Sequence, residues 1–301
     1  MATMPKLRYR TVVPLNNFEI NIRKPFHFSP NVTIERIPGT LRKDKQLERL
    51  AQYDRERLDA CTHSLVFHYE AEGLYSADPN WKGKEPRTIE KANGEAASLA
   101  NLAFWLQHPS PLGFSLTFHM PEFTTFVIQA SEVRDRFLCH PDNKDERVTR
   151  KDLKPAKELF AALTKIPRET SVWTAIRALI AALQMNVEEI RYLLLWVALE
   201  ALFGAPSEIT YRISERLAFF IGKNKAEKQS LFSDAKKGYG FRSKVAHGAW
   251  KKNKDSTALT ATSEGLLRRA LVRLLLDDNI SKHFLGKDDA RNKYLDELVF
   301  L

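Results

Sequence analysis

Residues 187–203 read VEEIRYLLLWVALEALF, and this stretch decides the fold of the second half of the chain. Apolar side chains occur on nearly every side of a helix drawn through it, which is typical of a helix packed inside a bundle. Asn186 is the expected N-cap, and acidic residues follow in the first turn, where the helix dipole favours them. Gly204 and Pro206 are expected to end the helix. The sequence therefore predicts one central helix over Val187–Phe203.

Helical periodicity continues on both sides of this stretch. Apolar residues recur at three- and four-residue spacing, and the connections are short, so neighbours are expected to be antiparallel, as in an up-and-down bundle. Ser207 is expected to cap the next helix, and Gly248 to close the one after it. The other predicted helices are Ser171–Gln184, Glu208–Ile221, Ala226–His247, Ser256–Leu276 and Asp288–Leu298.

The N-terminal half has a different pattern, in which alternating, β-branched and aromatic runs predict strands. We predict an α+β protein, with a mixed α/β domain over residues 1–150 and an all-α helical bundle over residues 151–301. The boundary is expected in the proline- and charge-rich segment Pro141–Pro155. The predicted strands are Thr11–Ile22, Asn31–Ile37, Ser64–Tyr69 and Ser115–Met120, with Phe123–Ala130 as a further candidate, and the predicted helices are Arg42–Ala60 and Ile89–Gln107.

Composition narrows the class of protein. With 301 residues, 44% of them hydrophobic and 28% charged, the chain is expected to be globular. Cys61 and Cys139 are too few for a disulfide framework or a metal cluster, and no cofactor is predicted. The apolar stretch Tyr192–Leu199 is too short to span a membrane, and the first residues lack the apolar run of a signal peptide, which favours a cytoplasmic protein. No zinc site is expected, because the histidines in the predicted strands have no carboxylate or cysteine partner at ligand spacing: His63, His68 and His119.

Positive charge is concentrated in one segment. The net charge is +10, and residues 223–254 alone contain ten basic and two acidic residues. Two readings are open, a solvated lysine face or a surface that binds a polyanion by neutralising its phosphates. In the second reading the lysines expected to bind RNA are Lys236, Lys237, Lys244, Lys251 and Lys252.

The same segment contains an arginine and a histidine in the sequence GYGFRSKVAHG, residues 238–248. Arginine can hold a phosphate, and histidine moves protons near neutral pH, so Arg242 and His247 have the chemistry to break an RNA backbone without a metal. The spacing alone is not specific. It occurs twice more in the chain, at Arg57/His63 and at Arg134/His140.

Three segments follow one another on consecutive predicted helices: WVALEALFG (196–204), EITYRISERLA (208–218) and YGFRSKVAHG (239–248). Together they resemble the HEPN family (higher eukaryotes and prokaryotes nucleotide-binding), and most of all its ApeA-like branch, over about residues 165–301. The resemblance implies a ribonuclease site on a late helix, usually completed across a homodimer or between two HEPN copies, and a role in phage defence or as a toxin. Many members carry Asn, Asp or His directly after the arginine, where this chain has Ser243.

The implied activity is that of a metal-independent endoribonuclease acting on RNA such as tRNA or mRNA. RNA supplies the nucleophile, its 2′-hydroxyl; His247 would serve as base or acid, and Arg242 would stabilise charge on the phosphate. On one helix Arg242 and His247 do not share a face, whereas Ser243 and His247 do. One histidine per chain supplies base or acid but not both, so a symmetric partner is expected to add the second.

Glu200 lies in the otherwise apolar central helix, where an ionised carboxylate needs a partner. Arg212 or Arg216 on the next helix is the expected partner, and the alternative is that Glu200 orients the candidate catalytic pair. Tyr239 is expected to pack in the bundle, with stacking on an RNA base as the alternative.

Two other functions are open. One is a non-catalytic HEPN module that binds RNA or nucleotides with the same basic surface. The other is a structural role, in which the helical half only dimerises and the N-terminal half acts. In the leading hypothesis the N-terminal half is a sensor, a regulator or a substrate selector.

Overall fold

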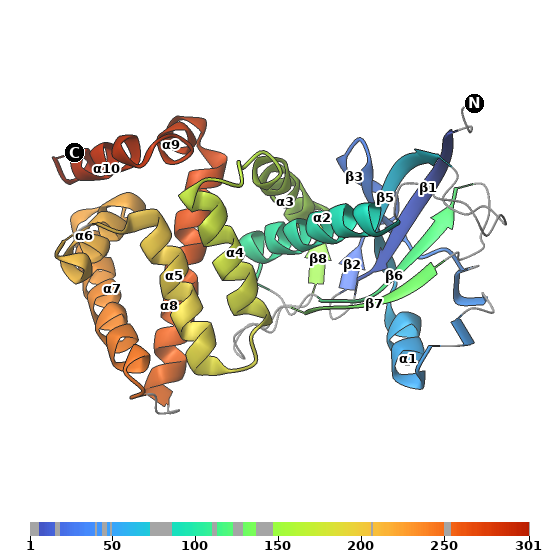
Figure 1. The fold of residues 1–301 in the computed structure, drawn as a ribbon, viewed down its shortest axis with the longest axis horizontal. Helices are drawn as coiled ribbons and strands as arrows, with labels where there is room; N and C mark the ends of the chain where they lie inside the picture. Colours follow the sequence, from blue (N-terminus) through green and yellow to red (C-terminus); the bar gives the residue numbers. More distant parts are fainter. Residues whose placement is uncertain are drawn as a thin grey trace. The chain divides into compact units, whose positions relative to one another are not determined.

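The computed structural model describes residues 6–15, 19–39, 41–43, 47–48, 50–72, 86–109, 113–122, 129–136, 147–205, 207–249 and 254–300. The chain divides into two compact units, Met1–Thr164 and Lys165–Leu301. The described part of the first contains an antiparallel sheet and that of the second contains helices alone, which confirms the predicted α+β fold (Figure 1). The division falls after the expected 150/151 boundary, because helix α3 (Arg150–Leu163) packs on α2 (Pro86–Gln107) within the first unit.

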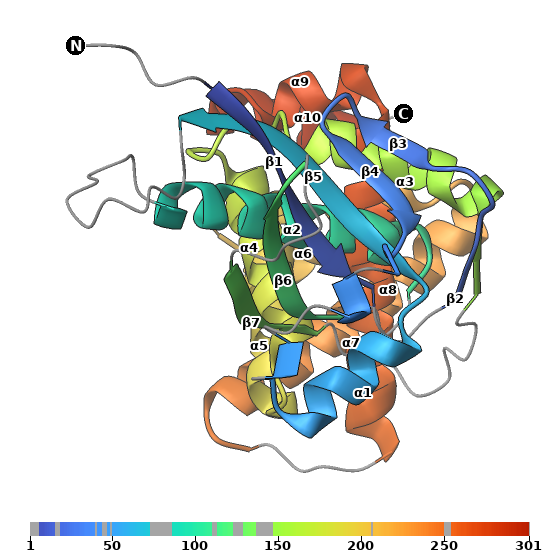
Figure 2. The ribbon, with the colours of Figure 1, turned by 90° about the vertical axis from the view of Figure 1, so that its right-hand side faces the viewer.

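The sheet of the first unit has six strands in the described part, in the order β3-β4-β5-β1-β6-β7, and each neighbouring pair is antiparallel (Figure 2). A separate parallel pair joins β2 and β8. The strands are β1 (Lys6–Pro14), β2 (Glu19–Asn21), β3 (Phe26–Ser29), β4 (Val32–Arg36), β5 (His63–Glu72), β6 (Gly113–Pro121), β7 (Gln129–Arg136) and β8 (Arg147–Thr149).

These strands agree with the predicted ones at β4, β5 and β6. The run predicted over Thr11–Ile22 forms two strands instead of one, because β1 ends at Pro14 and β2 begins at Glu19. Most of the candidate strand Phe123–Ala130 lies outside the described residues, as does Cys139.

Alternation along the strands gives the sheet two different faces. On one face, Val12, Val66 and Phe118 pack with Leu41 and Leu58 in a single buried cluster. Elsewhere in the unit, aromatic packing ties the edge strand β3 to both helices. Phe28 of β3 contacts Phe104 of α2 and Phe160 of α3, with ring centroids 5.2 and 5.7 Å apart.

The helix predicted over Arg42–Ala60 is shorter than expected. The structure has a 3-10 turn, η1 (Leu41–Lys43), and a helix, α1 (Gln52–Ala60). The leucines whose spacing suggested one helix all reach the same buried cluster from separate elements, so burial alone explains their pattern. The helix predicted over Ile89–Gln107 is confirmed as α2 and ends before His108, as expected.

The described helices of the second unit match the predicted ones closely, and α9 is an addition that was not predicted. Helix α5 contacts α4, α6, α7 and α8, which confirms its central position. None of the helices in the described residues is long and apolar enough to cross a membrane. The helices are α4 (Ser171–Gln184), α5 (Glu188–Phe203), α6 (Ile209–Ile221), α7 (Lys225–Ala246), α8 (Lys254–Leu276), α9 (Asp278–Phe284) and α10 (Asp288–Glu297), followed by the 3-10 turn η3 (Leu298–Phe300).

Two predicted N-caps are wrong. Helix α5 is capped at Val187 without a side-chain hydrogen bond, so Asn186 stands one residue too early to serve. Helix α6 is capped at Glu208, whose backbone is left-handed at a φ of 50°, and Ser207 likewise lies outside the cap position. Pro206, expected to help end α5, is outside the described residues.

Candidate functional site

Helix α7 approaches the central helix α5 closely at Gly238. The hydroxyl of Tyr192 donates a hydrogen bond to the Gly238 carbonyl oxygen at 2.7 Å. A Cβ atom at position 238 would lie 2.6 Å from the Trp196 ring, which is closer than real Cβ atoms approach other heavy atoms. The glycine therefore permits a contact that fixes α7 against α5, and this contact positions the residues one turn later along α7.

One turn after Gly238, Arg242 of α7 pairs with Glu200 of α5. Arg242 Nη2 lies 3.0 Å from Glu200 Oε1 and donates a hydrogen bond to Oε2 at 3.3 Å. Both side chains are 28% exposed, so the pair is open to solvent on one side. The expected pairing of Glu200 with Arg212 or Arg216 is wrong, and the alternative, in which Glu200 orients Arg242, agrees with this geometry.

Arg216 has a structural role at the end of α5. Its guanidinium donates to the carbonyl oxygens of Phe203 at 3.3 Å and Gly204 at 2.6 Å, and it pairs with Asp296 of α10 at 3.0 Å. The last carbonyl groups of a helix have no partner within the helix, and this arginine supplies one. Arg212 instead lies 3.4 Å from Glu215 on its own helix.

Tyr239 forms one wall of the site. Its ring packs edge-on against Trp196, with centroids 5.4 Å apart, and the Arg242 guanidinium lies over it at 5.6 Å. Partial burial, together with the nearby Glu200 carboxylate, raises the pKa of Tyr239. The expected packing role therefore fits, and the ring also contacts the Arg242 guanidinium by a cation–π interaction.

Hydrogen-bonding capacity is left over where these residues meet. Arg242 Nε, Glu200 Oε1 and Trp196 Nε1 are buried and have no hydrogen-bond partner in the described part of the chain. Glu200 Oε1 is within ion-pair distance of Arg242 Nη2, so it keeps the charge contact without a hydrogen bond of good geometry. A buried group without a partner costs about 1–3 kcal/mol, and here that cost falls on Arg242 Nε and Trp196 Nε1.

Ser243 and His247 lie at the C-terminal end of α7 and are exposed. His247 is the C-cap, and Gly248 follows with a left-handed φ of 79°. The N–H of Gly248 bonds the Val245 carbonyl and that of Ala249 bonds the Lys244 carbonyl, both at 2.9 Å, which is the Schellman pattern. The helix thus ends where Gly248 predicted. It leaves the imidazole in solvent, with no partner among the described residues.

The predicted lysines differ in their surroundings. Lys236, Lys237 and Lys244 are exposed on α7, and the Lys236 ammonium lies 5.9 Å from the Phe232 ring centroid. Lys251 and Lys252 lie outside the described residues. Of the arginine–histidine pair 134/140, the backbone of Arg134 lies in β7 and His140 is outside the described residues.

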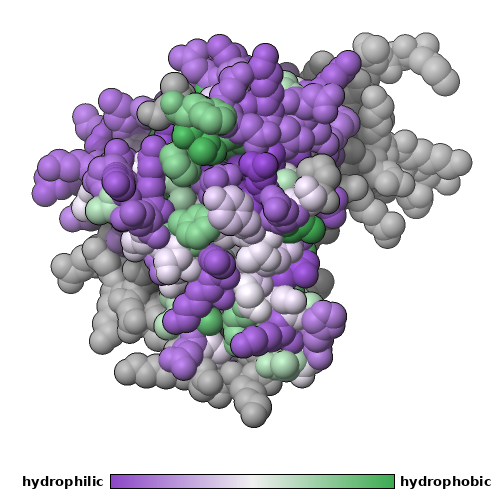
Figure 3. All heavy atoms as spheres, turned by 90° about the vertical axis from the view of Figure 1, so that its left-hand side faces the viewer, coloured by the Kyte–Doolittle hydropathy of each residue, from purple (hydrophilic) through white to green (hydrophobic). Residues whose placement is uncertain are grey.

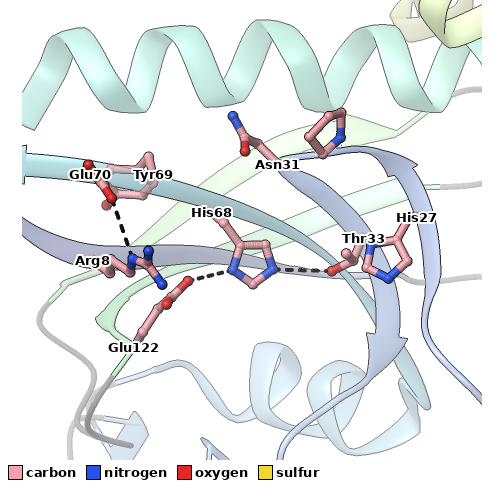
Figure 4. Close-up of a pocket in the computed structure, with 9 residues that line it drawn as sticks. Arg8, His27, Asn31, Thr33, His68, Tyr69, Glu70 and Glu122 are labelled. Atoms are coloured by element: carbon pink, nitrogen blue, oxygen red, sulfur yellow. Dashed lines mark hydrogen bonds and ion pairs between the residues drawn. The ribbon is translucent and has the colours of Figure 1, made fainter.

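A second polar cluster lies on the sheet of the first unit, and sequence spacing did not reveal it (Figure 4). His68 Nδ1 lies 2.6 Å from Glu122 Oε1, and its Nε2 lies 3.4 Å from the Thr33 hydroxyl. These residues line a cavity of about 580 Å³ together with Arg8 and Glu70. His68 thus has a carboxylate partner in space, Glu122, although none stands at ligand spacing in the sequence.

Strand pairing explains why that partner was missed. β1 lies between β5 and β6, so it brings together residues that are far apart in the sequence. The described residues contain no group of three or more His, Cys, Asp or Glu side chains that could hold a metal ion.

Trp196 and Gly238 are further residues of the α5–α7 site to which sequence reasoning gave no role. Trp196 lies in segment 196–204 and Gly238 in segment 238–248. The signal that could have found their contact is Gly238 itself, because a glycine inside a helical pattern indicates close packing against a neighbouring helix. Comparisons of this chain with family models, with curated proteins and with solved structures found no match.

Proposed function

We propose that this protein is a metal-independent endoribonuclease of the HEPN type, in which Arg242 binds the scissile phosphate and His247 transfers a proton. The observation that carries the proposal is the Glu200–Arg242 pair. It holds a guanidinium in place beside Tyr239, five residues before an exposed histidine at the helix end. An oriented arginine is worth more for binding a phosphate than a mobile one, because its donors are already aligned.

The reaction uses the RNA's own 2′-hydroxyl as nucleophile. A base removes the 2′-hydroxyl proton, the 2′-oxygen attacks phosphorus, and the 5′-oxygen leaves with a proton from an acid. The products are a 2′,3′-cyclic phosphate and a 5′-hydroxyl. Arg242 stabilises the negative charge on the non-bridging oxygens, and Nη1 is free for this because no described residue accepts from it.

A homodimer is part of the proposal, because each chain offers one His247 and the reaction needs both a base and an acid. Arg242 and His247 are separated by five residues, which places them on different faces of α7. Helix α5 and its N-cap carry apolar side chains that stay exposed, namely Val187, Ile190 and Val197, the last one turn before Glu200. Exposed apolar residues along one helix support association with a second copy.

The wider role is proposed on the resemblance alone. It is defence against phage, or action as a toxin, in the cytoplasm, with tRNA or mRNA as the substrate. The sheet unit would then act as sensor, regulator or substrate selector. Its polar cavity around His68 is a place where a small polar ligand fits.

Incubating the purified protein with total RNA in EDTA tests the activity. Wild type is expected to produce fragments with 2′,3′-cyclic phosphate ends, and His247→Ala is expected to lose at least ~100-fold in rate, the lower end of what a general acid or base contributes. Arg242→Ala is expected to lose activity as well, and Arg55→Ala, at an exposed arginine of α1, serves as the control. Equal cleavage by wild type, His247→Ala and Arg242→Ala would refute this site.

The second candidate is a non-catalytic module that binds RNA. The exposed lysines of α7 favour it, because they supply phosphate contacts without any chemistry. It predicts RNA binding that weakens steeply with salt, and no cleavage by wild type under any condition of the same assay.

A further inference from the structure

A groove between α6 and α7 combines aromatic and basic side chains. Its volume is about 570 Å³, a size that suits one small ligand group. Figure 3 views the side on which α6 and α7 lie in Figure 1, and apolar residues gather there in a few spots among hydrophilic ones. The lining residues that matter here are Tyr211, Glu215 and Phe219 from α6, and Lys225, Lys228 and Phe232 from α7.

Aromatic rings and lysine ammonium groups both line this groove. Tyr211 is 49% exposed, and its ring meets Phe232 edge to face with centroids 5.4 Å apart. The Lys228 ammonium lies 4.4 Å from the centroid of the Phe219 ring. Single-stranded nucleic acid is bound by this combination, because bases stack on aromatic rings while lysines neutralise the phosphates.

The charges around the groove favour a polyanion over a second copy of the chain. Glu215 is its acidic lining residue, and Arg212 Nη1 bonds that carboxylate at 3.4 Å, which offsets its charge. Lys225 and Lys228 therefore give the groove a net positive charge. Two copies meeting at this groove would bring the same lysines together, and like charges in contact repel.

One stripe of helix α7 leads from the groove to Ser243 and His247. Residues 232, 236, 239, 243 and 247 follow one another at spacings of three or four, so they lie along one stripe of the helix. At ~1.5 Å per residue, Phe232 and Ser243 are about 16 Å apart along the axis. A strand that reaches from the groove to Ser243 must therefore extend over more than one nucleotide.

We propose that the α6–α7 groove binds a base of single-stranded RNA a few nucleotides away from the phosphate that Arg242 and His247 act on. The inference rests on the proposed function and adds the substrate class, an unpaired strand. Tyr211 and Phe232 hold the base, and Lys225 and Lys228 hold the flanking phosphates. A duplex does not fit this role, because the faces of its bases are covered by stacking.

Binding of a fluorescent, 2′-O-methylated single-stranded RNA, followed by anisotropy, tests the inference on the full chain. That RNA cannot be cut, because its 2′-oxygens carry no proton. Tyr211→Ala is expected to weaken binding by about 5- to 150-fold, which corresponds to the ~1–3 kcal/mol that one stacked base contributes. Phe232→Leu, which keeps the packing but removes the ring, is expected to act in the same direction.

Two controls separate stacking from charge and from folding. Tyr53→Ala removes another tyrosine, 63% exposed in the first unit with Arg57 over its ring, and is expected to leave binding unchanged. Inorganic polyphosphate has phosphates but no bases. Its binding is therefore expected to survive Tyr211→Ala and to weaken in the double variant Lys225→Gln/Lys228→Gln.

Each outcome decides between the two proposals. Loss of RNA binding in Tyr211→Ala, beside a wild type that cuts no RNA, would keep the groove and reject the nuclease. Cleavage by wild type, beside unchanged binding in Tyr211→Ala and Phe232→Leu, would reject the groove and keep the nuclease. A wild type that binds no RNA would also overturn the inference. So would a Tyr211→Ala variant that binds RNA normally but has a different molecular mass by light scattering, because the groove would then be a protein interface.

Discussion

Two arginine–glutamate pairs join α5 to its neighbours, and they differ in how far they are open to solvent. Arg191 of α5 pairs with Glu264 of α8, and these side chains are only 10% and 9% exposed. Glu200 of α5 pairs with Arg242 of α7, and both of these are 28% exposed. Burial raises the pKa of Glu264, while the Arg191 guanidinium acts in the opposite sense.

The same pair of residue types therefore serves two purposes in one bundle. A largely buried pair contributes mainly through the penalty for losing one partner. A pair with one open side contributes little to stability but presents a fixed guanidinium to the solvent. The difference predicts that variants of the first pair act on folding and variants of the second act on function.

The largest expected effect is on the buried pair. Glu264→Ala leaves Arg191 charged and buried, and we expect the free energy of unfolding to fall by ~3–5 kcal/mol, measured by urea denaturation. The double variant Arg191→Met/Glu264→Leu removes both charges and is expected to recover most of that loss. If Glu264→Ala were as stable as wild type, the two pairs would not differ in their contribution to folding.

A smaller effect is expected where α7 touches α5. Gly238→Ala places a methyl group against Trp196, and overpacking of this kind costs ~1–3 kcal/mol. Gly240→Ala is the matched control on the same helix, because nothing lies within 4 Å of a Cβ atom at that position. It is expected to stabilise the protein by ~0.5–1 kcal/mol through helix propensity. Thermal unfolding of the two variants should therefore shift in opposite directions.

The smallest effect on stability is expected at the open pair. Glu200→Ala should change the free energy of unfolding by no more than ~1 kcal/mol, as for other pairs near the surface. RNA cleavage by the proposed nuclease should nevertheless fall, because Arg242 loses the carboxylate that orients it. Glu200→Gln keeps an acceptor for Arg242 and should retain more activity than Glu200→Ala. A Glu200→Ala variant that cleaves normally but unfolds as easily as Glu264→Ala would reverse the comparison.

Sequence reasoning reached most of the helical unit because its signals are local. The apolar run of α5, the end of α7 at Gly248 and the boundaries of α4 all follow from residues close in sequence. The N-caps at Asn186 and Ser207 failed, because a shift of one residue moves a capping side chain out of reach.

The candidate site was predictable in part, for the same reason. Arg242, Ser243 and His247 were found as a motif. The partner of Glu200 was expected on α6 and lies on α7 instead, since pairing across a bundle depends on how the helices rotate. His68 and Glu122 were missed because their meeting depends on strand order, which no spacing along the chain encodes.

The C-terminal end of α5 depends on helix α10 as well as on its own sequence. Arg291 of α10 donates to the Ala201 carbonyl oxygen at 2.9 Å, and Asp296 of the same helix holds Arg216 on the Phe203 and Gly204 carbonyls. Glu200 belongs to this last turn, because the Gly204 N–H bonds its carbonyl oxygen. Shortening the chain before Asp288 would thus loosen the turn that carries Glu200 and change the setting of Arg242 from a distance, so activity comparisons require the intact C-terminal helix.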